Sequence, residues 1–482
     1  MTGEHGIDQG AERGIEHGDE HGAGVVARWV DDRLRVSKFA DSVLNHVFPD
    51  NWSFLLGEIA MYCFVILVLT GVFLTFFFHA GSRDVVYSGS YGPLRGVHMS
   101  EAYDSTISLS FDVRAGLVVR QIHHWTALVF AAAVVAHLCR IFFTGAFRRP
   151  REINWIIGVT MLILVIFNGF AGYSLPDDLL SATGLRIGYS ILLSIPFVGT
   201  WIASLFFGGP YPGTAVIGRL FIIHVLILPA LIAVLLSIHL AIVWRQKHTQ
   251  FPGAGRTEHN VTGLRLWPTY AAKSAGLFAG VVAVVSALGG LAQINPLWLY
   301  GPYRTGAVTT AAQPDWYMGW LEGSLRLFPA WRVHLFGHTI SELFWPGVVV
   351  PGLTFALLYA WPFIEARVTH DRTDHELLDR PRTRPGRTAI GAGVLTFYLV
   401  LMGAGSQDIF AQHLDAPITT VNRTFQVLLF VAPIVVALLT WKLCRDLTAR
   451  PPDDSEEPEP ELEPGTPPEL ELEPARGAPP RG

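Results

Sequence analysis

The sequence predicts an all-α, polytopic membrane protein with about eight transmembrane helices, and three observations carry this prediction. Half of the 482 residues are hydrophobic and only 16% are charged, a balance typical of membrane proteins rather than soluble domains. Eight apolar segments have about the 20 residues that a helix needs to cross a bilayer. Basic residues gather in alternate connections between these segments, as the positive-inside rule requires.

The eight segments lie at 53–78, 117–143, 153–174, 218–244, 270–292, 343–364, 388–405 and 423–444. The runs RRPR at 148–151 and WRQKH at 244–248 and the Arg-rich 365–387 connection all fall on one side of the membrane, with both chain ends. We expect that side to be cytoplasmic in a multi-pass plasma-membrane protein, with both termini in the cytoplasm. The loops on the opposite side are longer and poorer in basic residues.

Composition divides the chain into six parts. The first and last are polar, and we expect a partly disordered cytoplasmic segment at 1–45 and an acidic, Pro-rich disordered tail at 446–482. The four parts between them are a four-helix bundle at 46–250, helices five and six with a long outer loop at 251–364, a polar cytoplasmic connection at 365–387, and helices seven and eight at 388–445. The three cysteines form no CxxC or CxxCH pattern, so disulfide frameworks and covalent c-type haem are unsupported.

The second and fourth segments each carry two histidines. His123 and His137 are 14 residues apart, which places them about 40° from alignment and about 21 Å apart along a helix. His224 and His239 are 15 apart and rotated by about 60°. Any one intramembrane histidine is more often hydrogen-bonded to a neighbouring helix. Four in paired register indicate the axial ligands of two stacked haems, whereas a closed zinc site needs four ligands at one point.

Two glycine pairs repeat the 14-residue spacing: Gly57 with Gly71, and Gly158 with Gly172. Small-residue helix packing is the simpler explanation, but the shared spacing predicts a bulky planar group pressed against each backbone at two levels. Arginines near the histidines would neutralise haem propionates, with snorkelling at the membrane surface as the alternative. These arginines are Arg120, Arg140 and Arg219.

In these residues the chain resembles cytochrome b of the respiratory cytochrome bc complexes. The resemblance covers roughly residues 45 to 445 and includes GYSLP at 172–176 and QPDWY at 313–317. It implies two non-covalent b-type haems. By the resemblance, the low-potential haem near the outer face is held by His123 and His224, and the high-potential haem near the cytoplasm by His137 and His239.

The resemblance also implies a donor and partners. PDWY in place of the commoner PEWY, together with the long tails, is similar to an actinobacterial member, which implies menaquinol as the electron donor. The implied partners are a Rieske iron–sulfur subunit, a c-type cytochrome subunit, membrane lipid, a second copy of the complex in a homodimer, and a terminal oxidase in a supercomplex. No nucleic-acid partner is implied.

The outer quinol site needs a proton acceptor, because a quinol loses two protons as it loses two electrons. Asp315 is the candidate, since burial raises the pKa of a carboxyl group toward the useful range. We expect Tyr317 and Tyr173 to shape the pocket, although PDWY alone would fit an interfacial aromatic turn. Asp177 and Asp178 replace WG of the family's LPWGQ run, and we expect them only to solvate an outer loop.

The inner quinone site departs from the family pattern. Trp244 stands where mitochondrial relatives carry a histidine, and the family's Lys-Asp pair becomes Lys273-Ser274. Proton delivery to this site is therefore not assigned by the resemblance. Lys247 and His248 lie nearby, with Arg245, although lipid-facing surface charge is their simpler role.

The resulting expectation is an enzyme subunit, a quinol–cytochrome c oxidoreductase that acts as a proton translocase. One electron from quinol would pass to the iron–sulfur partner, and the other through the haems to a quinone at the cytoplasmic face. Two alternatives stay open. A di-haem membrane anchor would relay electrons without bifurcation and would not need PDWY. A transporter would use the histidines to line a proton path.

Overall fold

The computed structural model describes residues 28–309, 313–335 and 337–449. In that part of the chain, eight helical spans are long and apolar enough to cross a membrane, which confirms the predicted all-α, polytopic fold. The spans are Trp52–Thr75, Gly116–Thr144, Glu152–Ser174, Val216–Gln246, Leu266–Leu291, Trp345–Thr369, Pro385–Gly405 and Ile418–Ala449. The segment 1–27 and the acidic tail from residue 450, both predicted to be disordered, lie outside the described residues.

The N-terminal half contains α2 (Val36–Leu44), β1 (Val47–Phe48), η1 (Trp52–Phe54), α3 (Leu55–Thr75), β2 (Asp84–Val86), η2 (Gly92–Leu94), β3 (His98–Ser100), α4 (Glu101–Phe111), α5 (Gly116–Thr144), α6 (Glu152–Ser174), α7 (Leu179–Ser194), α8 (Gly199–Phe207), α9 (Val216–Ile222), η3 (Ile223–Ile227) and α10 (Leu228–Gln246). The C-terminal half contains β4 (Leu264–Arg265), η4 (Leu266–Tyr270), α11 (Ala271–Leu291), α12 (Leu297–Tyr300), η5 (Trp316–Met318), α13 (Gly319–Leu327), β5 (Val333–Leu335), β6 (His338–Ile340), η6 (Trp345–Val349), α14 (Val350–Thr369), η7 (Pro381–Thr383), α15 (Pro385–Gly405), α16 (Gln407–His413) and α17 (Ile418–Ala449).

Sheet structure in the described part is limited to three antiparallel pairs of short strands, β1 with β4, β2 with β3 and β5 with β6. The first pair, β1 with β4, joins the starts of two membrane spans. Val47 lies opposite Arg265 and Phe48 opposite Leu264, so the segment that enters α3 is tied to the segment that enters α11.

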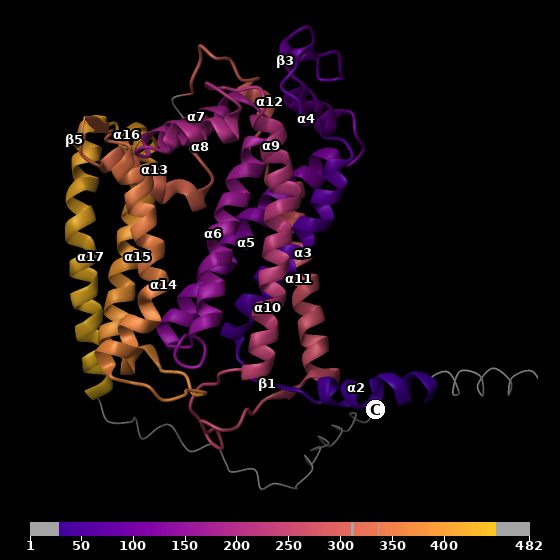
Figure 1. Cartoon of the computed structure of the whole chain (residues 1–482), viewed down its shortest axis with the longest axis vertical. Helices are drawn as coiled ribbons and strands as arrows, with labels where there is room; N and C mark the ends of the chain where they lie inside the picture. The colour runs from indigo at the N-terminus through magenta and orange to yellow at the C-terminus, as the bar shows by residue number, and fades with distance from the viewer. Residues whose placement is uncertain (1–27, 310–312, 336, 450–482) are drawn as a thin grey trace, which may run out of the picture.

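The spans form two groups in Figure 1. On one side α3 packs on α5, α5 on α11, and α6 on α10, while on the other side α15 packs along α17 with α14 beside it. The connecting helices α4, α7, α8, α12 and α13 gather at one end of the molecule. α2 and the last turn of α17 lie at the opposite end, so the two ends of the described chain share a side, as the predicted topology requires.

A buried apolar layer crosses the middle of the first group. It includes Cys63 and Ile66 of α3, Phe130 of α5, Val165 of α6 and Ile232 of α10. Since α5 and the span Val216–Gln246 each carry a candidate histidine before and after this layer, it separates two polar levels within the bundle.

The expectation that Asp177 and Asp178 only solvate a loop is wrong for Asp178. Its side chain is fully buried and caps α7, accepting hydrogen bonds from Leu180 N at 3.1 Å and from Ser181 Oγ at 2.6 Å. A buried N-cap satisfies amide donors that a helix start leaves unpaired. Asp177 is half-buried beside it, and burial raises the pKa of its carboxyl group to about 6.

Candidate functional site

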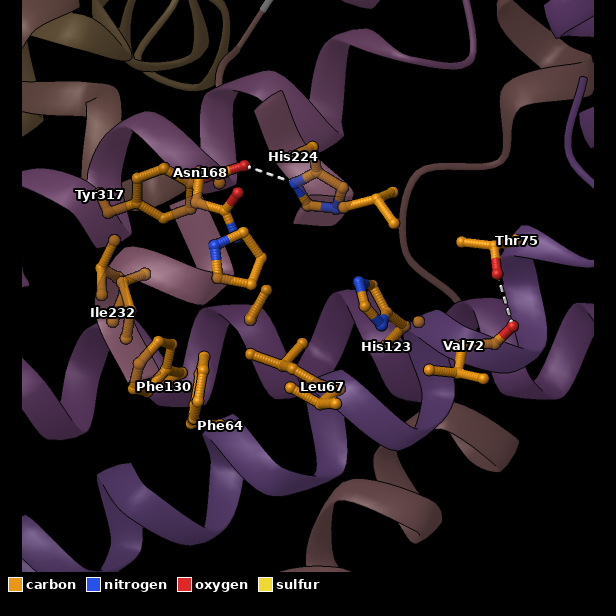
Figure 2. Close-up of a pocket in the computed structure, with 18 residues that line it drawn as sticks. Phe64, Leu67, Val72, Thr75, His123, Phe130, Asn168, His224, Ile232 and Tyr317 are labelled. Atoms are coloured by element: carbon orange, nitrogen blue, oxygen red, sulfur yellow. Dashed lines mark hydrogen bonds between the residues drawn. The ribbon is translucent and has the colours of Figure 1, made fainter. Parts of the chain in front are cut away.

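The four candidate histidines line two cavities at two levels of the bundle. His123 of α5 and His224 of η3 line a cavity of about 170 Å³ near the end that carries the long connections. Figure 2 shows both rings pointing into this space from opposite helices. His137 of α5 and His239 of α10 line a second cavity, of about 480 Å³, toward the other end. The resemblance stated above implied these two pairings.

The outer pair has the geometry of two ligands for one metal. Nδ1 of His224 donates to the carbonyl oxygen of Asn168 at 2.9 Å. Nδ1 of His123 lies 2.8 Å from Oγ1 of Thr70, and that hydroxyl already donates to the Ile66 carbonyl, so the imidazole N–H is the donor. These bonds leave both Nε2 lone pairs for a metal. The ring centres are 6.2 Å apart, and two imidazoles bonded at about 2 Å to one ion would place them about 6 Å apart.

A bulge in the fourth span corrects the unequal histidine spacing. Residues Ile223–Ile227 form one π-helical turn, with the N–H of Leu228 bonded to the Ile223 carbonyl. Such a turn takes up one extra residue without changing the face of the helix that follows. The 15 residues from His224 to His239 therefore match the 14-residue register of the histidines on α5.

The four glycines each lie against one of the four histidine rings: Gly57 against His137, Gly71 against His123, Gly158 against His239 and Gly172 against His224. A Cβ at Gly57 would lie 3.1 Å from Cε1 of His137, and a Cβ at Gly71 would lie 3.3 Å from Cε1 of His123. The approach is tightest at Gly172 and loosest at Gly158. The glycines of α3 and α6 thus leave room for the candidate ligand rings, which come from α5, η3 and α10.

Two of the three candidate arginines are buried cations with unused donors. Nε and Nη2 of both Arg120 and Arg140 are buried without a hydrogen-bond partner in the described residues. An unpaired buried guanidinium is costly, and a carboxylate such as a haem propionate would satisfy it. Arg219 differs, because it is exposed and donates to the carbonyls of Ser204 and Leu205 in α8.

Asp315 does not stand alone. Nε2 of His124 lies 2.9 Å from its Oδ1, and the Tyr317 hydroxyl donates to its Oδ2 at 3.1 Å. Both side chains of the His124–Asp315 pair are only 15% exposed. Burial and the Asp315 charge raise the pKa of Tyr317, so the phenol keeps its proton and donates. Tyr173 is close enough to interact electrostatically with both Asp315 and Tyr317.

Tyr317 joins this cluster to the outer histidine pair. Its ring lines the same cavity as His123 and His224. It packs on Gly169 of α6, where a Cβ would lie 2.5 Å from the phenol oxygen. Sequence reasoning identified Tyr317 but missed Gly169 and His124. The signal for His124 was its position in a membrane helix, where an ionisable side chain needs a polar partner.

Comparison with known proteins now bears on these sites. The chain is 52% identical over 416 residues, 86% of its length, to the cytochrome b subunit of the cytochrome bc1 complex of Mycobacterium tuberculosis, and covers 76% of that relative. It is 48% identical over 432 residues to the corresponding subunit of Streptomyces coelicolor, with 89% of this chain and 78% of that one covered. The chain belongs to the cytochrome b family.

Two further comparisons agree. The family described as "Cytochrome b(N-terminal)/b6/petB" matches residues 128–302. A chain of a solved structure described as "Hyperthermophilic respiratory Complex III" has the same fold, with a TM-score of 0.65 at 20% identity, over 86% of this chain and 99% of the other. The predicted cytochrome b, in a family of oxidoreductase subunits, is confirmed. Proteins of this family normally bind haem, and the paired imidazoles, the facing glycines and the unpaired arginines fit that group.

Proposed function

We propose that this cytochrome b binds two b-type haems and oxidises menaquinol at the end of the bundle that carries the long connections. One electron from each quinol goes to a Rieske iron–sulfur subunit. The other goes through the two haem levels to a quinone near the opposite end. Each quinol oxidised releases two protons on the outer side, and the one electron that reaches the inner quinone is accompanied there by one proton, so two quinols are oxidised for each quinone fully reduced. This release and uptake on opposite sides couples electron transfer to proton translocation.

The observation that carries the proposal is the position of Asp315 relative to the outer histidine pair. Its partner His124 directly follows His123, and its other partner, Tyr317, lines the His123–His224 cavity. A proton acceptor and a one-electron carrier are thus adjacent. Quinol oxidation needs both at one place, because each electron leaves with a proton.

The residues of the outer site have distinct roles in this proposal. The Asp315 carboxylate accepts a proton from the quinol hydroxyl, as a general base held in a mostly buried pocket. His124 and Tyr317 fix the carboxylate from both sides. The haems, when bound, supply one-electron acceptors at the two levels. The apolar layer around Phe130 and Ile232 keeps water out of the space between these levels.

The buried arginines hold the haem edges in this proposal. Arg120 is positioned for a propionate at the outer level and Arg140, whose guanidinium stacks over Phe54 at 4.3 Å, for one at the inner level. His123 with His224 would hold the iron of one haem, and His137 with His239 that of the other. Absorbance of the purified protein tests this directly, since a transporter with histidines along a proton path would show no reduced b-haem bands.

Asp315→Asn tests the quinol chemistry. The variant should keep its haem spectrum but lose quinol:cytochrome c turnover by roughly 10²-fold or more, the usual contribution of a general base. Asp84→Asn is a matched control, because Asp84 also pairs with a histidine, His98, at 2.7 Å on an outer loop, but both side chains are about two-thirds exposed. Turnover of the control should be unchanged.

Full turnover by Asp315→Asn would favour the second candidate, a di-haem anchor that relays electrons without bifurcation. The Asp315 cluster favours the first, since an anchor has no need of a carboxylate beside the outer histidines.

We further propose that the subunit lies in the plasma membrane with both termini in the cytoplasm. Its partners there would be a Rieske subunit, a c-type cytochrome, a second copy in a homodimer and, in a supercomplex, a terminal oxidase.

A further inference from the structure

A polar cluster joins α3 to α11 at the inner end of the bundle, and neither the sequence pattern nor the outer site accounts for it. Its centre is Glu58, the only acidic residue in α3. Ser274 Oγ donates to Glu58 Oε2 at 2.8 Å, and the Tyr270 hydroxyl donates to Oε1. Tyr62, one turn along α3, donates to Oε2 at 3.3 Å and also contacts Ser274.

Glu58 lies on the wall of the inner cavity. Glu58, Tyr270 and Ser274 all line the space of about 480 Å³ that also contains His137 and His239. Glu58 directly follows Gly57, the glycine that His137 packs against. The cavity is mostly apolar elsewhere, and aromatic rings close its end: Phe48 stacks on Tyr270 with ring centres 4.4 Å apart. A flat apolar molecule with polar edges would suit such a space.

The other ionisable groups around this cavity are basic. Arg140 of α5 and Arg151 before α6 line it, as do Lys247 and His248 after α10. Burial and the neighbouring His46, Arg151 and Arg140 lower the pKa of His248 to about 4, so at neutral pH this imidazole is uncharged and lacks the acidic proton of an imidazolium.

Lys273 and Asp50 lie outside the cavity. They form an ion pair with each other, with side chains 38% and 48% exposed. Glu58 is therefore the acidic group that the described chain presents to the cavity.

We propose that Glu58 is the proton-delivering residue of an inner quinone-reduction site, and that Tyr270 and Ser274 hold its carboxyl group toward the bound quinone. The inference rests on the proposed function, which brings electrons to the inner histidine level. It places the carboxyl group on α3, whereas the family pattern has an aspartate at the position of Ser274. An intramembrane carboxyl group with three hydroxyl neighbours is a functional candidate in its own right.

The step balances as follows. One quinone becomes one quinol by gaining two electrons, which arrive singly from the inner haem level, and two protons. The protonated Glu58 carboxyl group gives one proton to a quinone oxygen, breaking its own O–H bond and forming the quinol O–H bond. Glu58 is then reprotonated from water at the cytoplasmic end and gives the second proton after the second electron.

Glu58→Gln in the assembled complex tests the proposal. During oxidation of a menaquinol analogue, rapid-mixing absorbance should show b-haem reduction through the outer site at the wild-type rate. Reoxidation of the b haems should slow by on the order of 10²-fold, and reduced b haem should accumulate. Redox-induced infrared difference spectra should lose a protonated-carboxyl band. Glu58→Asp, which keeps the acid on a shorter chain, should recover part of the reoxidation rate.

Asp50→Asn is the matched control, since it removes a carboxylate near the same helix end but outside the cavity. It should keep both the infrared band and the reoxidation rate. If Glu58→Gln fails to assemble, Tyr270→Phe removes one donor and should shift the pH profile of reoxidation. Reoxidation at the wild-type rate and an unshifted pH profile in these variants would overturn the proposal. Failure of quinol to reduce the wild-type b haems would instead contradict the proposed function.

Discussion

Two glycines on one helix provide a sharp test of the paired haem levels. A Cβ added at Gly172 would clash with Cε1 of His224, its nearest atom, and would also lie 2.8 Å from Nε2, about 0.6 Å inside ordinary contact at 3.4 Å. The ring has little freedom to retreat, because its Nδ1 is bonded to the Asn168 carbonyl on the same helix as Gly172. A Cβ at Gly158 would lie 4.0 Å from Cε1 of His239, which is ordinary contact.

Gly172→Ala should therefore disturb the outer haem, and Gly158→Ala should not disturb the inner one. Overpacking costs about 1–3 kcal/mol, and loss of the Asn168 hydrogen bond would add about 1 kcal/mol. We expect Gly172→Ala to lose outer haem or to shift its midpoint potential. Gly158→Ala should retain both haems, with both potentials close to those of the wild type.

The assay is a redox titration of purified protein followed by reduced-minus-oxidised absorbance, with haem content measured per chain. Each variant adds one methyl group to α6, so a general effect of such a change on this helix would appear in both variants. Equal loss from both variants, or loss from Gly158→Ala alone, would refute the assignment of Gly172 to His224.

Three further predictions follow from other contacts. His124→Leu should slow quinol oxidation about tenfold or more at unchanged haem content, because it removes a donor that fixes the outer carboxylate. Asp177→Asn should raise thermal stability by about 1–3 kcal/mol above pH 6 but not near pH 4. Because the pKa of Asp177 is raised from 3.8 to about 6 in the folded protein, the protonated carboxyl group favours the folded state fully below pH 3.8, and this stability is lost as the pH rises through 6. Arg387→Ala should cost about 3–5 kcal/mol in thermal unfolding by leaving the buried Glu365 carboxylate without its cation, whereas Arg332→Ala, at an exposed ion pair, should leave thermal unfolding nearly unchanged.

Much of the fold was predictable because hydrophobic length and basic connections report directly on membrane spans. The histidine pairs were predictable for a similar reason, since spacing on a straight helix fixes a face. The π turn at Ile223–Ile227 was not, because it depends on local backbone bonding before Pro229 that a uniform helix does not represent. It explains why a spacing of 15 residues works as well as 14.

The partners of the polar residues were harder to predict. His124 is one residue from a candidate ligand and points to another part of the chain, but its partner Asp315 is 191 residues away. Glu58 and Ser274 are likewise 216 residues apart. Asp178 looked like a solvated loop residue until the pairing of its segment with Pro302 buried it. Such contacts depend on how connections fold over the bundle, which neither periodicity nor composition reports.

A density map of the purified complex that resolves side chains is the most direct measurement of the central claim, that four histidines bind two haems at two levels. Two planar densities are expected, one between Nε2 of His123 and His224 and one between those of His137 and His239, with Arg120 and Arg140 at their edges. A map with no planar density between either pair, or with another side chain bound to the iron, would contradict it.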